Sequence, residues 1–113
     1  PVEVIVDVTA VFSTRGELDY LPASPVLLLD TRPSRVAAGG QTQFVVPQAE
    51  LPTRAVSVNV TAVLHDADGY TTLFNAADAA IVPIGAEMTG CLFTSSATSL
   101  IVDLNGWWVA TAI

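Results

Sequence analysis

Apolar and polar residues alternate along most of this chain with a period of two. Such alternation is typical of β-strands, and the alternating runs are rich in the β-branched residues Val, Ile and Thr. Gly, Pro, Asp and Asn gather in the short segments between the runs, as expected of turns. The pattern predicts about eight strands. They cover residues 2–12, 26–32, 42–47, 55–64, 70–75, 80–84, 90–94 and 99–109.

The spacing of these runs leaves little room for helices. Only residues 48–51 and 75–80 fit a single helical turn. The chain has 113 residues, of which 51% are hydrophobic and 13% charged, a composition that supports one buried core and excludes a disordered chain. We therefore predict an all-β fold in one domain over residues 1–113, built as a two-sheet antiparallel β-sandwich of the jelly-roll or immunoglobulin-like kind.

One strand pattern occurs three times. The sequence VDVTAVF of residues 6–12 returns as VNVTAVL in residues 58–64 and, more loosely, as VDLNGWW in residues 102–108. Three similar strands are also compatible with a β-trefoil or a β-prism, which is the alternative fold. The segments between the three copies do not resemble one another, whereas a trefoil repeats whole units. The sandwich is therefore the preferred prediction.

Each copy of this pattern predicts one apolar face and one polar face. The polar face carries an acidic or amide residue near its middle, which is Asp7, Asn59 or Asp103, followed two residues later by Thr or Asn. We call these three residues the polar row. One interpretation is that they simply face solvent. The other is that the three copies lie side by side and form a partly acidic groove for sugar hydroxyls or a cation.

Trp107 and Trp108 are neighbours in the last predicted strand, so their side chains are expected on opposite faces. The alternation places Trp108 in the core and Trp107 outside. An exposed Trp is either a stacking platform for a sugar ring or a contact for a neighbouring module or partner protein. Tyr70 lies beside a predicted turn, where its ring extends either kind of surface.

Asp30 and Arg32 are two residues apart in a predicted strand and share one face. They follow three consecutive leucines, so a partly buried carboxylate–guanidinium pair is the structural interpretation. In the alternative, Arg32 binds a carboxylate or a sugar hydroxyl in a groove. Cys91 lies in an apolar run and is predicted to pack in the core as a small hydrophobic residue.

The reactive residue types do not assemble into a catalytic pattern. His65 is the only histidine and no nucleophile motif accompanies it, so we predict a turn residue and a chain that is not an enzyme. The acidic turn at residues 66–69 lacks the remainder of a calcium loop, and a single cysteine excludes a multi-thiolate metal site. We expect neither a metal nor another cofactor.

The charge balance narrows the range of partners. Four Lys and Arg residues stand against eleven Asp and Glu, which gives a formal net charge of −7, and all four cations are dispersed arginines. Nucleic acid binding needs clustered cations and is not expected. The apolar runs are shorter than the roughly 20 residues of a membrane span, so no membrane span is predicted. We expect any signal sequence to lie upstream of Pro1 or to have been removed.

Four short motifs follow one another along the chain: LDTR at residues 29–32, GQT at 40–42, NVTA at 59–62 and VDLNGWW at 102–108. In this order they resemble an all-β module of secreted actinobacterial, including mycobacterial, cell-surface proteins, in which the terminal strand reads Val-Asp-Val-x-Gly-Tyr-Phe. The resemblance covers nearly the whole chain and implies an extracellular location, often in tandem or beside cell-wall hydrolases. It also implies that residues 2–12 are either the terminal strand of a preceding module or a strand that closes the sheet.

These observations favour a non-catalytic accessory or adhesion module at the actinobacterial cell envelope, with a binding or spacing role. A carbohydrate- or cell-wall-binding module is the second hypothesis, with Trp107, Tyr70 and the polar row as ligand residues. The third is a structural unit that assembles into an oligomer through open sheet edges. The expected partners are accordingly a cell-wall glycan, a protein, a tandem module or a second copy.

Overall fold

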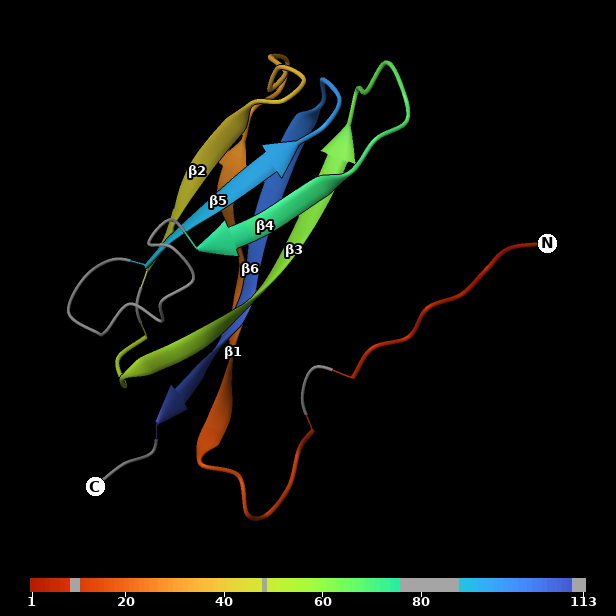
Figure 1. Cartoon of the computed structure of the whole chain (residues 1–113). Coiled ribbons are helices and arrows are strands. Elements are labelled where there is room, and N and C mark those ends of the chain that lie inside the picture. The colour runs from red at the N-terminus through yellow and green to blue at the C-terminus, as the bar shows by residue number, and fades with distance from the viewer. Residues whose placement is uncertain (9–10, 48, 76–87, 111–113) are drawn as a thin grey trace.

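The computed structural model describes residues 1–8, 11–47, 49–75 and 88–110. It contains two antiparallel sheets of three strands each, and none of the described residues is helical (Figure 1). The strands are β1 (Leu18–Asp30), β2 (Gln41–Val46), β3 (Thr53–Val63), β4 (Thr71–Asn75), β5 (Met88–Thr94) and β6 (Ser99–Ala110). One sheet has the order β1-β6-β3 and the other β2-β5-β4. The prediction of an all-β chain with two antiparallel sheets is confirmed, with six strands among the described residues.

The hydrophobic core lies between the two sheets. Its buried members alternate along β6 and meet residues of β2 and β5 from the other sheet: Leu100, Val102, Leu104, Phe44, Val46 and Leu92. Alternate valines of β3, at positions 56, 58 and 60, pack against this cluster. Burying one such aliphatic side chain contributes about 1.5–3 kcal/mol. The alternation expected along residues 100–104 and 56–60 is confirmed, because both strands turn their apolar face to one core.

An extra residue interrupts the alternation of β6. Ser57 of β3 pairs with Gly106, but the next residue, Val58, pairs with Leu104, so Asn105 has no register partner in β3. An extra residue of this kind is a β-bulge, and it moves every later side chain to the opposite face of the sheet. The inward side of β6 therefore changes from even-numbered residues before the bulge to odd-numbered residues after it.

This bulge reverses the expected positions of the two tryptophans. Trp107 packs against the core, and its indole Nε1 donates a hydrogen bond of 2.8 Å to the carbonyl of Pro47. Trp108 lies on the outer side, where its ring centroid is 4.9 Å from that of Tyr20 and 5.1 Å from that of Phe12. The prediction of a core Trp108 and an outward Trp107 is wrong, because strict alternation does not hold across the bulge.

The described residues of the stretch 2–12, which are 2–8 and 11–12, do not form a strand, and this corrects the prediction. The described residues of this stretch are exposed. The Phe12 ring contacts Trp108, and residues 2–8 extend away from both sheets (Figure 1). A turn follows before β1 begins, in which the Gly16 N–H donates to the Ser13 carbonyl at 3.1 Å. A strand needs a hydrogen-bonded neighbour to be stable. The central place in the sheet is taken by β6, which carries the same sequence pattern.

Strand β1 begins at Leu18, well before the predicted start at Val26, and passes through Pro22 and Pro25. Its pairing with β6 shifts register twice, and one shift lies between Pro22 and Val26. β1 is an edge strand, so a proline there does not interrupt the interior of the sheet. The two prolines explain why the sequence pattern identifies only the second half of this strand.

Other predicted elements fall outside the described residues or are absent. The strand expected at 80–84 lies outside them, as does the helical turn expected at 75–80 apart from Asn75, which ends β4. Residues 49–51 are described and are not helical, so the helical turn expected there is wrong. Two sheets sharing one core also argue against the β-trefoil and β-prism alternatives.

Candidate functional site

Three connections gather at one end of the molecule, which we call the loop end and which lies at the top of Figure 1. They are residues 31–40 between β1 and β2, residues 64–70 between β3 and β4, and residues 95–98 between β5 and β6. Arg35 and Asp66 form an ion pair that joins the first two connections. The Ser96 hydroxyl donates to the Asp68 carbonyl at 2.7 Å and joins the second to the third. Loops held in this way on a rigid scaffold are a common place for binding sites.

A cavity of about 460 Å³ opens at the loop end. Its wall combines an aromatic ring, an imidazole, hydroxyl groups and a carboxylate, and includes Tyr70, His65, Thr94, Ser96, Thr98 and Asp68. These residues come from the connection between β3 and β4, the end of β5 and the connection between β5 and β6. The volume falls within the range of small-molecule sites. This cavity is the candidate functional site.

Tyr70 supplies the aromatic part of the wall. The residue is 65% exposed, and its ring centroid is 6.0 Å from that of Phe93. Its backbone N–H donates to the Ser95 hydroxyl at 2.8 Å, and its carbonyl accepts from the Ser95 N–H at 2.9 Å. Gly69 permits this close approach, because a Cβ at that position would lie 2.7 Å from the Ser95 Oγ. The ring is therefore presented to solvent from a fixed backbone.

The hydroxyl groups of the cavity wall act as donors within the protein. Thr94 Oγ1 donates to the Ser96 carbonyl at 2.6 Å, and Thr98 Oγ1 donates to the Val63 carbonyl at 2.9 Å. A hydroxyl oxygen that donates its hydrogen still has lone pairs that can accept. Thr94 and Thr98 are only 2% and 3% exposed, so the acceptor oxygens within reach of a ligand are those of Ser96 and Asp68. Acceptor oxygens beside an aromatic ring fit a ligand rich in hydroxyl donors.

His65 lies exposed at the cavity wall. The neighbouring Asp66 is paired with Arg35, so the acidic turn at residues 66–69 ties two connections together. Within residues 1–8, 11–47, 49–75 and 88–110, no group of three His, Cys, Asp or Glu side chains is placed to hold a metal ion. Cys91 is buried in β5, with 3% of its surface exposed. The arrangement fits recognition by hydrogen bonding and ring contact.

The polar row has two of its three expected members. Asn59 and Asp103 are register partners in the β3–β6 ladder, so they lie side by side on one face of the sheet. The Asn59 Nδ2 donates to Thr61 Oγ1 at 3.1 Å. Asp7 lies among the exposed N-terminal residues outside both sheets, so the expected three-membered groove is not present. On the other side of Asp103 the register partner is Leu27 of β1.

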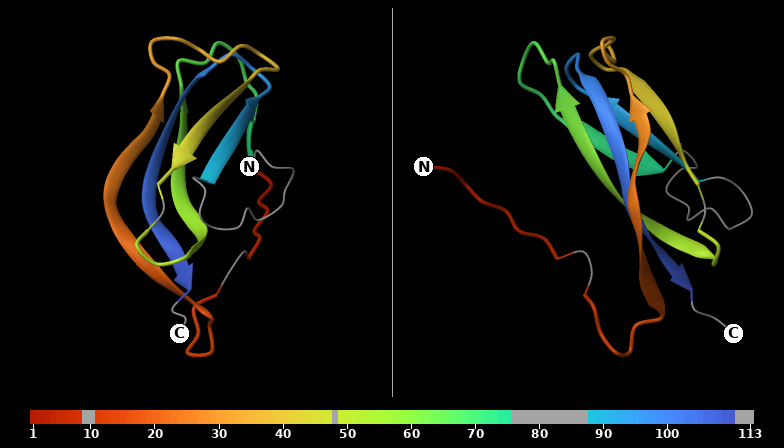
Figure 2. Two further views of the ribbon diagram at one scale, coloured as in Figure 1. Left: turned by 90° about the vertical axis from the view of Figure 1, so that its left-hand side faces the viewer. Right: turned by 180° about the vertical axis from the view of Figure 1, so that it is seen from behind.

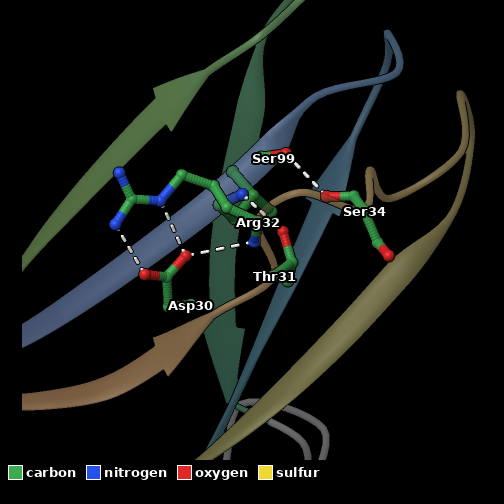
Figure 3. A network of polar contacts seen from close by, with 6 residues as sticks. Asp30, Thr31, Arg32, Ser34 and Ser99 are labelled. Atoms are coloured by element: carbon green, nitrogen blue, oxygen red, sulfur yellow. Dashed lines mark hydrogen bonds and ion pairs between the residues drawn. The ribbon is translucent and has the colours of Figure 1, made fainter.

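Asp30 and Arg32 form a two-pronged ion pair at the end of β1 (Figure 3). Arg32 Nε donates to Asp30 Oδ1 at 2.9 Å and Nη2 to Oδ2 at 2.6 Å, while the Arg32 backbone N–H donates to Oδ1 at 3.1 Å. The side chains are 23% and 51% exposed respectively, so the guanidinium is less buried than expected. The hydrogen bonds from Arg32 lower the pKa of the Asp30 carboxyl below its ordinary value of 3.8.

The residue between them fixes this end of β1 to the central strand. The Thr31 N–H donates to the Leu100 carbonyl at 3.1 Å, and Thr31 Oγ1 accepts from the Leu100 N–H at 2.9 Å. The Ser99 hydroxyl donates to the Ser34 carbonyl at 2.6 Å (Figure 3). The ion pair therefore lies beside a chain segment that is anchored to β6. The guanidinium of Arg32 is already bound by the Asp30 carboxylate of the same chain.

Replacing Arg32 with alanine is expected to lower the melting temperature at pH 7, because the Asp30 carboxylate loses its partner. A carboxyl whose folded pKa is lowered stabilises the fold above its unfolded pKa, and this contribution is lost as the pH falls through the folded value. The difference between the parent and Arg32→Ala should therefore shrink below pH 3.8. Thermal melts from pH 7 to pH 2 measure it, with Arg15→Ala as an exposed control. A pH-independent difference would contradict this origin of the stability.

Only one predicted ligand residue, Tyr70, lines the cavity. Trp107 packs inward, Arg32 is paired with Asp30, and the two aligned members of the polar row lie on β3 and β6. The hydroxyl residues of the wall were not predicted as ligand residues. Their signal in the sequence is the run TSSATS at residues 94–99, which is rich in Ser and Thr and lies between two strands. Their meeting with Tyr70 depends on pairing between distant segments.

Comparison with known proteins finds no relative of this chain. No protein-family model, curated protein or solved structure matches the chain. Among the described residues, no helix is long and apolar enough to cross a membrane. The chemistry of the cavity at the loop end is therefore the evidence that bears on function.

Proposed function

We propose that this chain is a non-catalytic extracellular accessory module that binds carbohydrate of the actinobacterial cell envelope in the cavity at the loop end. The observation that carries the proposal is the exposed ring of Tyr70 beside acceptor oxygens in a cavity of about 460 Å³. Sugar rings have an apolar face that packs on aromatic side chains and hydroxyl groups that donate to oxygen acceptors. Both kinds of partner occur within this one cavity wall.

The charge of the site favours a neutral glycan over an anionic ligand. Asp68 lies at the cavity wall, and the chain has a formal net charge of −7. Arg35, the cation of this loop end that reaches the turn beside the cavity, is paired with Asp66. Phosphates and nucleic acids need unpaired cations or clustered donors. A neutral sugar needs neither.

The proposed architecture is a β-sandwich of the immunoglobulin-like or jelly-roll kind. It is supported by the two antiparallel sheets, their shared core and the gathering of three connections at one end. Sandwiches of this kind often carry their ligand sites on such connections. The envelope location is supported by the order of the LDTR, GQT, NVTA and VDLNGWW motifs. An accessory role is supported by the wall hydroxyls, because those of Thr94, Ser96 and Thr98 donate to backbone carbonyls and not to the His65 imidazole.

Cosedimentation of the purified chain with insoluble actinobacterial cell walls tests this function. The parent chain should be retained and released by soluble sugars of the bound class. Tyr70→Ala should weaken retention roughly tenfold, since an aromatic contact contributes about 1.5 kcal/mol. The ring is largely exposed, so the melting temperature should change little. Tyr70→Phe keeps the ring and should keep most of the retention.

Two outcomes would contradict the proposal. If the parent chain is not retained on any wall fraction, the carbohydrate function is wrong. If Tyr70→Ala is retained as well as the parent, the binding residues lie elsewhere than this cavity.

A further inference from the structure

The N-terminal segment, defined as residues 2–8, exposes an unusual amount of apolar surface. Its five large hydrophobic residues are between 75% and 87% exposed: Val2, Val4, Ile5, Val6 and Val8. Contiguous apolar side chains in water are unfavourable, and on soluble proteins they commonly mark an interaction surface. The segment extends away from both sheets in Figure 1 and in the right view of Figure 2.

The sequence of this segment is that of a strand already present in the sheet. Residues 4–8 read VIVDV, and residues 100–104 of β6 read LIVDL, with Ile-Val-Asp shared at the centre. In β6 this pattern pairs antiparallel with β3, where Asp103 is opposite Asn59. One side of β3 therefore already accepts a strand of this pattern.

Among the described strands, none pairs with the other side of β3. β3 is the end strand of the order β1-β6-β3, and its 11 residues contain neither Pro nor Gly. The opposite edge strand, β1, contains Pro22 and Pro25, and prolines protect an edge against pairing. The edge strands of the second sheet have only 6 and 5 residues. β3 is thus the longest proline-free edge among the described strands, and its pairing with β6 is regular from Val58 to Val63.

We propose that the N-terminal segment of one copy adds as an antiparallel strand to the free edge of β3 in a second copy. By analogy with β6, Asp7 would lie opposite Asn59, which places Val6 opposite Val60 and Val8 opposite Val58. Val60 and Val58 pack against the core, so Val6 and Val8 extend the apolar face of the sheet. The Asn59 amide then lies between two carboxylates, which completes the polar row across two molecules.

We assign the occupant to a second copy because residues 1–8 form no pairing with their own β3 and stand apart from it (Figure 1). The ring of Phe12 lies against Trp108 with a centroid distance of 5.1 Å, and a turn at residues 13–16 leads on to β1. From this anchor, residues 1–8 run outward into solvent (Figure 2). Backbone hydrogen bonds supply the affinity of such added strands, and alternate side chains set their register.

Light scattering of the full chain tests the proposal through two matched variants. Val6 and Ile5 are 82% and 87% exposed, so lysine at either position should leave the monomer folded. In the proposed pairing the Val6 side chain faces the core side of the second copy, and the Ile5 side chain faces solvent. We expect the parent and Ile5→Lys to show multiples of 11.8 kDa, and Val6→Lys to be a monomer. The measurement needs about 0.15 M salt to screen the net charge of −7.

A disulfide experiment tests the register and the molecularity. A chain carrying Asp7→Cys is mixed with a differently tagged chain carrying Asn59→Cys, and a disulfide between the two tags is expected on oxidation. Cys91 is buried and should not compete. Asp7→Cys with Thr72→Cys on the second sheet is the matched control, for which we expect no comparable product. Three results would overturn the proposal: a monomeric parent at high concentration, assembly that persists in a chain beginning at residue 13, or equal assembly of Val6→Lys and Ile5→Lys.

This inference does not rest on the carbohydrate site. The segment and the Tyr70 cavity have no residue in common, so Val6→Lys should keep cell-wall retention per molecule and Tyr70→Ala should keep the assembled mass. A failure of one proposal is therefore distinguishable from a failure of the other.

Discussion

Replacing Leu104 with alanine is expected to lower the free energy of unfolding by about 2–5 kcal/mol. Leu104 is fully buried in β6, the central strand of its sheet, and belongs to the core cluster that joins both sheets. The substitution removes apolar contact and leaves a cavity that rigid sheets fill poorly. Total stability of a domain is about 5–15 kcal/mol, so the loss is a large share of it. Urea unfolding followed by tryptophan fluorescence measures the change.

Leu27→Ala is the matched control for this prediction. Leu27 lies in β1 of the same sheet, is 57% exposed and pairs with Asp103. The same chemical change at this position should cost less than about 1 kcal/mol, as is usual for exposed sites. Comparable losses at the two positions would mean that the core is not centred between the two sheets.

The period-two pattern predicts the parts of the fold that depend on local sequence. Leu100, Val102 and Leu104 face the core because strand geometry alone sends alternate side chains to one side. The antiparallel pairing of β3 with β6 also agrees with their shared pattern, since similar apolar faces must meet the same core. These features need no knowledge of distant residues beyond the existence of a second sheet.

The errors arise where pairing between distant residues decides the outcome. The bulge at Asn105 reverses the two tryptophans. Its signal in the sequence is the neighbouring Gly106, because an isolated glycine within a strand pattern often marks a bulge, but the strict alternation passed over it. Residues 2–12 have an excellent strand pattern, but a strand forms only where a sheet offers a partner. β1 starts early because its pairing with β6 outweighs the poor strand propensity of Pro22 and Pro25.

In the candidate site, too, features set by local sequence can be predicted and features set by pairing between distant segments cannot. Tyr70 could be singled out from the sequence, because an aromatic residue beside an Asp-Gly turn is placed at a loop. Its hydroxyl neighbours in residues 94–98 are far away in the sequence and reach it only through the β4–β5 pairing and the Ser95 hydrogen bonds. The prediction of a three-membered polar row is wrong at Asp7 for a further reason, because Asp7 belongs to neither sheet of the structure.

Replacing Gly90 with alanine is expected to lower the free energy of unfolding by about 1–3 kcal/mol. Gly90 of β5 is the register partner of Phe44 in β2. The ring of Phe44 lies over the glycine, and a Cβ there would be 2.8 Å and 2.9 Å from the two Cε atoms. Phe44 is only 5% exposed and packs in the core, so the ring has little freedom to withdraw. Chemical denaturation of the variant measures the loss.

A double-mutant cycle with Phe44→Leu assigns this loss to the ring. Leucine at position 44 is smaller over the glycine, so the methyl group of Gly90→Ala should find space in that background. Alanine is otherwise the better strand residue, because glycine loses more backbone freedom on folding. We therefore expect Gly90→Ala to be close to neutral beside Phe44→Leu, with a coupling energy above about 1 kcal/mol. Equal losses in both backgrounds would place the strain in the backbone of β5 and not in the contact with Phe44.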